Sequence, residues 1–408
     1  MVGYDGDADR PCDSASRERN PPTVPTTPDH VLTTHAGSLP RPPDLLQMMF
    51  DRGAGKPVDA AALEARIASA VQEIVRTQRD MGIDLVSDGE MSKTGFSTYI
   101  YERLTGFSGQ GEFFATDVAD FPELAMRLFA TPTAALIVMP NCEGAIEPRD
   151  QAAVSRDIAN FKAALGDDVS AGFLPAATPG QITFNFVNKF YPSHLAYLEA
   201  AAQAMQPEYE AIAAAGLTLQ LDSPDLAMAG HSGTVGTDLT NLQEHIEQAI
   251  GVLNDATRAI PPEQMRLHVC WGNYAGPHHK DVPLRDIVRP ILQTRAKAIY
   301  VEAANPRHEH EWEVWNEVAL PPDKVLIIGA IDVLTNHVEH PRLIAQRIER
   351  FARIVGRERV IAGTDCGFGT FAGWSACDPK VAWLKLQTLV DGAREATQSL
   401  FGSAAATT

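Results

Sequence analysis

The sequence has few basic residues, few cysteines and no long apolar run. Its 34 lysine and arginine residues face 52 aspartate and glutamate residues, so the formal net charge is −18. This charge opposes binding to a nucleic-acid backbone or to an anionic membrane surface. The five cysteines are an odd number spread over 408 residues, unlike the disulfide framework of a small secreted protein. Because no run of about 18 apolar residues could span a bilayer, we expect a cytoplasmic protein.

The first 29 residues are rich in aspartate, proline and serine and contain no apolar segment typical of a secretory signal. We therefore expect a disordered tail over residues 1–29, in which Cys12 has no role. One folded domain is expected over residues 30–400, because 45% of the residues are hydrophobic and a single α/β barrel often exceeds about 250 residues.

From residue 30 onward, short apolar segments alternate with segments of helical periodicity, which is the pattern of βαβ units. In the first unit, Asp59 is suited to cap a helix that Gly82 ends. One apolar stripe runs along this helix: Leu63, Ile67, Val71 and Ile74. A second helix with such a stripe is expected from Pro341 to Gly356.

Eight apolar segments predict the eight parallel strands of a (β/α)₈ TIM barrel. They lie near residues 31–37, 83–88, 171–177, 217–222, 266–271, 298–303, 325–331 and 359–364. A doubly wound open sheet is the competing architecture, but the Gly-rich phosphate loop that usually follows its first strand is absent. Residues 100–165 are too long for one connection and predict an insertion on the active-site face, with a strand over 134–139 and a turn over 141–144.

Four residues that can bind a metal stand at the predicted ends of barrel strands. His268 and Cys270 are two residues apart, and on a strand they would share one face. Glu302 and Cys366 follow two later strands, whose carboxyl ends meet at the same edge of a barrel. This set favours Zn²⁺ over ions that prefer oxygen ligands only. A lone His-x-Cys pair reflects core packing more often than metal binding, so the prediction depends on the whole set.

Several short segments occur in the order seen in one enzyme family. They are Thr33 to Pro40, Ser87 to Met91, Leu219 to Pro224, His268 to Cys270, Tyr300 to Glu302 and Thr364 to Gly367. Over about residues 30–375 the sequence resembles the catalytic, C-terminal barrel of the cobalamin-independent methionine synthases, a group with single-barrel relatives such as the epoxyalkane:coenzyme M transferases.

The resemblance implies a zinc-dependent enzyme that transfers a methyl or alkyl group to a thiol. It implies that His268, Cys270, Glu302 and Cys366 bind zinc. It further implies that Gly37, Ser38, Glu90 and Asp222 hold homocysteine, and that His337 donates a proton to the leaving group. Zinc replaces the proton of a bound thiol and so provides a nucleophile at neutral pH.

Four of these residues also have another interpretation. Asp222 could build a strand-end turn, Glu90 could cap the next segment, and Glu302 could contact substrate in place of zinc. His337 could be an ordinary loop histidine, because the sequence around it departs from the family. The aromatic and histidine side chains after Cys270 are expected to shape the pocket for the alkyl donor.

Methyl transfer to homocysteine, as in 5-methyltetrahydropteroyltriglutamate-homocysteine S-methyltransferase, is the first expectation. Double-barrel members of the family use an N-terminal barrel to help bind polyglutamyl folate, and this sequence matches the catalytic barrel alone. The donor therefore stays open between a methyl-folate and a methyl-corrinoid. The alternatives are an epoxyalkane:coenzyme M transferase, a metal-free decarboxylase of the uroporphyrinogen decarboxylase type, and a barrel with structural zinc. The oligomeric state is not predicted.

Overall fold

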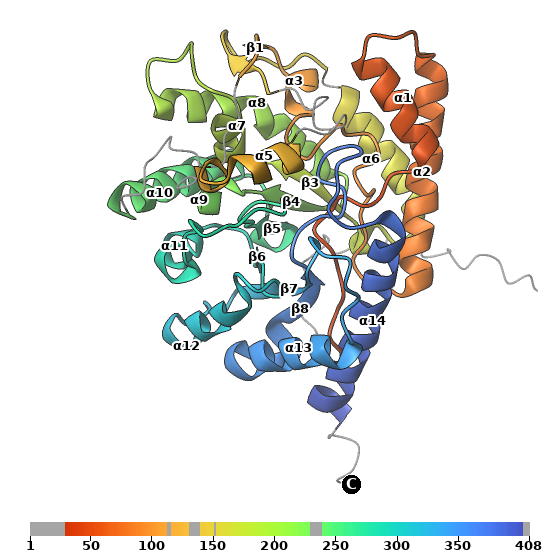
Figure 1. The fold of residues 1–408 in the computed structure, drawn as a ribbon, viewed down its shortest axis with the longest axis vertical. Coiled ribbons are helices and arrows are strands. Elements are labelled where there is room, and N and C mark those ends of the chain that lie inside the picture. The colour runs from red at the N-terminus through yellow and green to blue at the C-terminus, as the bar shows by residue number, and fades with distance from the viewer. Residues whose placement is uncertain (1–28, 112–115, 130–138, 151, 229–238, 403–408) are drawn as a thin grey trace, which may run out of the picture.

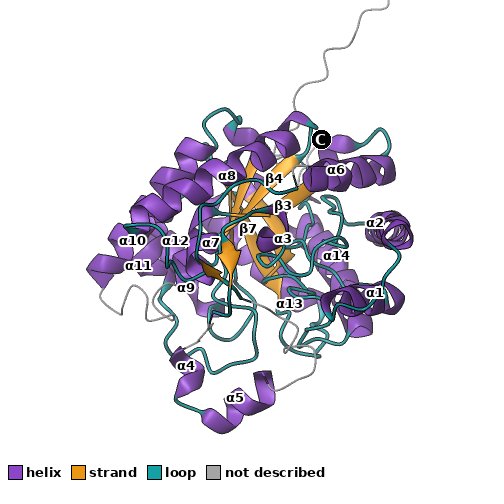
Figure 2. Ribbon diagram, turned by 90° about the horizontal axis from the view of Figure 1, so that it is seen from above, coloured by secondary structure: helices purple, strands orange, loops and turns teal. Residues whose placement is uncertain are grey.

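The computed structural model describes residues 29–111, 116–129, 139–150, 152–228 and 239–402 (Figure 1). The predicted tail lies outside these ranges apart from Asp29. Strands gather at the centre of the molecule and helices surround them (Figure 2). The fold is an α/β barrel, as the alternating pattern of the sequence predicted.

Six parallel strands lie side by side in chain order. They are β3 (Phe173–Ala177), β4 (Thr218–Asp222), β5 (Met265–His268), β6 (Ala298–Val301), β7 (Val325–Ile331) and β8 (Val360–Thr364). All but one of these bounds lie within two residues of the predicted strands. The exception is β5, which ends at His268 and leaves Cys270 just beyond the strand.

Two short stretches of chain close this sheet into a barrel. Thr33 forms a parallel bridge with Ala362 of β8, and Val86 forms one with Gly172, the residue before β3. The first two predicted strands therefore occupy the positions between β8 and β3, where a barrel needs them. They form only isolated bridges, so the sequence predicted their place in the barrel but overstated their length.

A side chain replaces part of the backbone pairing between these two stretches. The carboxylate of Asp84 accepts hydrogen bonds from the backbone N–H of Thr33 at 2.7 Å and from its hydroxyl at 2.8 Å. A carboxylate that accepts a backbone N–H competes with regular strand pairing. This local competition explains why the strand near Thr33 is short.

The helices outside the barrel show the predicted stripes. Asp59 caps α2 (Ala60–Met81) by accepting hydrogen bonds from the backbone N–H groups of two residues in the first turn, and Gly82 ends it with φ of 89°. The apolar stripe of α2 is buried, as is that of α13 (Pro341–Val355). No helix among the described residues is long and apolar enough to cross a bilayer. The other long helices are α1 (Pro43–Gly53), α6 (Ala152–Leu165), α8 (His194–Ala214), α10 (Leu239–Ala256) and α14 (Pro379–Phe401).

The insertion between the second and third barrel strands differs from the prediction. Helix α6 is a regular outer helix that packs between α2 and α8, so the inserted part ends before residue 152. The expected turn at 141–144 begins with β2 (Asn141–Cys142), which pairs antiparallel with β1 (Phe107–Ser108). Most of the expected strand over 134–139 lies outside the described residues.

The insertion also holds three short helices, α3 (Ile100–Arg103), α4 (Thr116–Ala119) and α5 (Pro122–Phe129). Helices α4 and α5 lie together to one side of the strands when the barrel is seen from above (Figure 2). The remaining short helices follow barrel strands: α7 (Pro179–Asn185), α9 (Asp225–Met228), α11 (Leu284–Ile291) and α12 (Val314–Glu317).

Candidate metal centre and active site

A cavity of about 630 Å³ lies at the carboxyl ends of the barrel strands. Residues at or just after the ends of five barrel strands line its floor, and residues of the insertion, of α7 and of the loops after β5 and β8 line the rest. The floor contributes Ser38, Glu90, Asp222, His268, Cys270 and Cys366. Six of the nine predicted site residues, far apart in the sequence, thus share one cavity.

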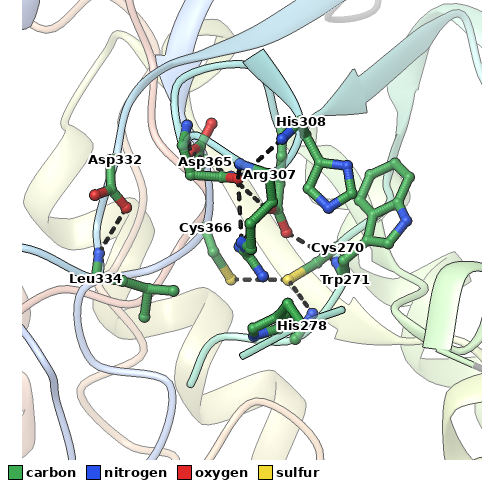
Figure 3. Close-up of polar contacts among 12 residues, drawn as sticks. Cys270, Trp271, His278, Arg307, His308, Asp332, Leu334, Asp365 and Cys366 are labelled. Carbon is green, nitrogen blue, oxygen red and sulfur yellow. Dashed lines mark hydrogen bonds and ion pairs between the residues drawn. The ribbon is translucent and has the colours of Figure 1, made fainter. Parts of the chain in front are cut away.

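Two thiols and one imidazole form a cluster within this floor. The Sγ atoms of Cys270 and Cys366 are 3.4 Å apart and face one another from different loops (Figure 3). Both cysteines are free, and one ligand atom from each of Cys270, Cys366 and His268 lies within 4.8 Å of the others. This is a donor set of the kind that binds a borderline-soft divalent cation.

A chain of hydrogen bonds orients the imidazole of His268. Its Nδ1 lies 3.0 Å from Oδ1 of Asp222, an oxygen that also accepts a hydrogen bond from the Gln220 amide at 2.7 Å. The buried guanidinium of Arg266 in turn donates to Gln220 at 2.7 Å. Because the carboxylate accepts at Nδ1, the lone pair of the ring is on Nε2, which is buried and has no partner. An unpartnered buried nitrogen beside two thiols is suited to bind a metal ion.

Glu302 lies beside this cluster but already has protein partners. One carboxylate oxygen accepts the backbone N–H of Trp271 at 2.8 Å, and the other accepts Asn305 at 2.7 Å and Arg307 at 2.9 Å. Its pKa is lowered although burial opposes this, because Arg307 and other cationic or donor groups surround it. Metal ligation by Glu302 stays a prediction, since the described cluster contains only His268, Cys270 and Cys366.

Asp365 connects the two loops of the candidate metal centre by hydrogen bonds. One of its oxygens accepts the backbone N–H groups of Ala303 and Ala304, and the other accepts both the backbone N–H and the side chain of Asn305. The loop after β6 is therefore held by hydrogen bonds to Asp365, the residue that precedes Cys366. Asp365 lies in the segment from Thr364 to Gly367 that carries the family resemblance, but its positioning role follows only from these contacts.

Glu90 presents an unsatisfied carboxylate to the cavity. Its side chain is buried, and its Oε2 has no hydrogen-bond partner. The residue has φ of 58°, a left-handed conformation that costs energy for a residue other than glycine. Arg41 helps to hold this conformation by donating to the carbonyl of Glu90 at 3.0 Å. A strained, buried and unpartnered carboxylate at the cavity is suited to receive a cationic group of a ligand.

Gly37 and Ser38 have different positions in the site. Gly37 has φ of 123°, and a Cβ there would lie 2.9 Å from Oε1 of Glu90, so glycine allows Glu90 to approach the first strand. Ser38 lines the cavity, whereas Gly37 is not among its lining residues. The structure thus brings Ser38 to the candidate substrate site and places Gly37 behind it.

His337 does not reach the cavity. Its side chain is exposed, and it is absent from the residues that line the cavity. The Lys385 ammonium donates to its backbone carbonyl. The predicted role as a proton donor stays untested, and the position of His337 gives it no support.

The buried carboxyl of Glu90 predicts a pH-dependent stability. Burial raises its pKa from 4.5 to about 7, with Lys93 opposing the shift. Protonation of Glu90 therefore contributes to the free energy of unfolding. This contribution is complete below about pH 4.5 and is lost as pH rises through about 7, which lowers the free energy of unfolding by about 3 kcal/mol. We expect Glu90→Gln to remove this loss from the free energy of unfolding, measured in urea at pH 5 and pH 8 without metal or thiol. Equal losses in wild type and variant would mean that another group titrates.

Fold and site together define a class: an α/β barrel with a candidate metal centre of two thiols and one imidazole at the carboxyl ends of its strands. A scan against protein-family models gives no match. A methionine synthase of Thermococcus kodakarensis is 24% identical over 361 residues, which cover 88% of this chain and 91% of the relative. A 5-methyltetrahydropteroyltriglutamate–homocysteine methyltransferase of Thermotoga sp. strain RQ2 is 21% identical over 90% of this chain, which spans only 45% of that longer protein.

The solved structures agree on the fold. The B12-independent methionine synthase of Shewanella sp. W3-18-1 superposes with a TM-score of 0.70 at 18% identity, over 91% of this chain and 99% of the other. Over most of its length the chain is thus similar to methionine synthases, and it shares the fold of a B12-independent methionine synthase, in agreement with the resemblance that the ordered motifs indicated.

Proposed function

We propose that the protein is a zinc-dependent transferase that methylates the thiol of homocysteine and so produces methionine. The observation that carries this proposal is the unpartnered Nε2 of His268 beside the thiols of Cys270 and Cys366, at the floor of a cavity of substrate size. The names of the similar proteins point in the same direction.

The residues present fit a zinc ion. Two sulfur ligands and one imidazole suit zinc better than a hard ion, and three protein ligands leave a coordination position for a substrate. When bound, zinc lowers the pKa of a coordinated thiol and keeps it as the nucleophilic thiolate near neutral pH. The backbone N–H of Gly272, 3.4 Å from the Sγ of Cys270, adds a donor to one ligand sulfur.

The remaining floor residues fit the amino-acid part of homocysteine. Glu90 and Asp222 place two carboxylates at the cavity, which suits an ammonium group, and the hydroxyl of Ser38 is suited to donate to a carboxylate. An amino acid held at these points and by its sulfur is fixed in position, so the thiolate can attack a methyl group along a single direction. The cavity walls are largely apolar, which disfavours water beside the reacting atoms.

Selectivity among thiols tests this proposal. Homocysteine should change the zinc X-ray absorption spectrum at a concentration at least about ten-fold lower than coenzyme M, because the carboxylates of Glu90 and Asp222 attract an ammonium and repel a sulfonate. The measurement is a titration of metal-loaded protein with each thiol.

Cysteine serves as the control for the length of the amino-acid thiol. The uncharged 2-mercaptoethanol serves as the control for a thiol without an ammonium group. Tighter binding of coenzyme M or of the neutral thiol than of homocysteine would contradict the proposal and favour alkylation of another thiol.

A further inference from the structure

A buried carboxylate of the insertion binds the loop over residues 271–283, which follows Cys270 and which we call the Cys270 loop. Asp117 of α4 accepts the hydroxyl of Tyr274 at 2.7 Å on one oxygen and the backbone N–H of His278 at 2.9 Å on the other. Because its side chain is fully buried, water does not compete for these hydrogen bonds. Asp117 does not itself line the cavity. One residue of the insertion thus holds two points of a loop that begins beside a candidate metal ligand.

The Cys270 loop is strained at one of the points that Asp117 holds. His278 has φ of 53°, and Glu90 is the only other non-glycine residue with positive φ in the described part of the chain. A residue stays in this left-handed region only when its surroundings fix it. Inside the loop, the His278 ring contacts the carbonyl of Tyr274 and the carboxylate of Asp281, both at 3.0 Å. Asp117 adds a contact from outside the loop, at the backbone of the strained residue.

The ring of Tyr274 extends this restraint to the metal centre. A Cβ on Gly272 would lie 2.7 Å from the ring, and one on Gly276 would lie 2.2 Å from it. The ring is therefore packed directly on the backbone of both glycines, which no larger residue would allow. The backbone N–H of Gly272 in turn donates to Sγ of Cys270 at 3.4 Å. Contacts thus run without a gap from the insertion to the sulfur of Cys270.

The insertion packs on a small apolar cluster apart from the barrel core. The buried members of this cluster are Val118, Met228 and Tyr274, which come from α4, α9 and the Cys270 loop. Helix α5 has no buried residue, and Met126 in it is 68% exposed. A small cluster outside the main core stabilises an element less than the core does. The hydrogen bonds of Asp117 therefore contribute a large share of what holds α4 at the cavity.

We propose that Asp117 is a positioning residue of the active site, which joins the insertion to the Cys270 loop and so places the N–H of Gly272 at the sulfur of Cys270. This inference deepens the proposed function, because it concerns the same site, and it gives Asp117 no contact with substrate. When α4 moves away from the cavity, the loop loses both hydrogen bonds to Asp117, one of them at the strained backbone of His278. Opening of the cavity wall and loosening of the Cys270 loop are therefore one event.

Hydrogen–deuterium exchange of the metal-free protein, resolved to single residues by mass spectrometry, tests this coupling. Asp117→Ala removes both acceptor oxygens, so the N–H of Gly272 should exchange about ten-fold faster or more. Gly272 donates to Cys270 and not to Asp117, so a faster rate there reports loosening of the whole loop. The N–H groups of β7 and α13 should exchange as in wild type. An unchanged rate at Gly272, or an equal increase throughout the barrel, would overturn the inference.

Two further variants make this experiment specific. Tyr274→Phe removes one of the two hydrogen bonds to Asp117 and keeps the ring, so it should raise the exchange rate of Gly272 by less than Asp117→Ala does. Asp120→Asn is the matched control, because Asp120 follows α4 directly and pairs with Lys280 at 2.6 Å, but its side chain is 46% exposed. An exposed ion pair holds a loop weakly, so this variant should exchange as wild type does. The same increase in Asp120→Asn as in Asp117→Ala would contradict a particular role of Asp117.

Alkylation by iodoacetamide gives an independent measurement on the same metal-free protein. Cys270 is 2% exposed, and the reagent reaches it more readily once the loop loosens. Asp117→Ala should raise the alkylation rate of Cys270 by about ten-fold relative to Cys377, a buried cysteine outside the cavity that reports global unfolding. Equal increases at both cysteines would mean a purely structural role. Neither experiment contains zinc, homocysteine or a methyl donor, so their failure would leave the proposed function standing, and the thiol titration can fail independently.

Discussion

Replacing Cys270 by serine is expected to remove nearly all bound zinc and to lower methyl transfer by on the order of 1,000-fold or more. The alcohol of serine does not ionise near neutral pH, so the cluster would lose one of its two thiolates. Cys366→Ser should have the same effect, because both sulfurs belong to one pair 3.4 Å apart. The measurement is elemental analysis of purified protein together with the rate of methionine formation.

Cys377→Ser provides the matched control, because Cys377 is a buried free cysteine that does not line the cavity. It should keep full metal content and activity. The barrel should stay folded in all three variants, since packing of strands and helices holds it and circular dichroism reports it. Full zinc occupancy in both Cys270→Ser and Cys366→Ser would show that these residues are not the metal ligands.

Asp222 is expected to act on the metal as well as on the thiol substrate. From the sequence alone, Asp222→Asn should weaken only the binding of the amino-acid thiol, by about ten- to a hundred-fold, through loss of a charge-assisted hydrogen bond. The structure adds the contact between Asp222 and Nδ1 of His268. Asp222→Ala, which removes this contact, should therefore also weaken zinc by about ten- to a hundred-fold. Chelator competition measures zinc affinity, and the Michaelis constant for homocysteine measures thiol recognition.

Asp84→Asn is the control for a partly buried carboxylate elsewhere in the barrel, since Asp84 accepts hydrogen bonds from Thr33 and does not line the cavity. It should change stability and leave both measured affinities intact. If Asp222→Ala keeps wild-type zinc affinity, Asp222 does not position His268. If the Michaelis constant for homocysteine is also unchanged, the role of Asp222 is structural.

A chain of hydrogen bonds runs from Arg266 through Gln220 and Asp222 to His268. The sequence predicted only a contact of Asp222 with substrate, and this chain adds the orientation of His268. Asp222 and His268 belong to neighbouring strands and are paired in register between β4 and β5. Their separation in the sequence gives no indication of that pairing. A carboxylate at the end of a strand can serve substrate, metal ligand or both, and only the register decides.

The aromatic residues that line the cavity illustrate the same limit. The sequence predicted that aromatic residues after Cys270 shape a donor pocket, and Tyr274 does line the cavity. Phe96, Phe129 and Trp374 had no local signal, because isolated aromatic residues in loops are common. They all line the cavity, because the loops that carry them meet there in the folded chain.

The sequence by itself determined the barrel architecture, because burial periodicity, helix caps and glycine stops are local features that repeat along the chain, as α2 and α13 show. It also placed His268, Cys270 and Cys366 at strand ends, which a parallel barrel must bring to one edge. Only the tertiary structure decided the orientation of His268, the free oxygen of Glu90, the protein partners of Glu302 and the exclusion of His337 from the cavity. Those properties depend on distances between side chains from different loops, and a pattern of residue types along one chain carries no such distances.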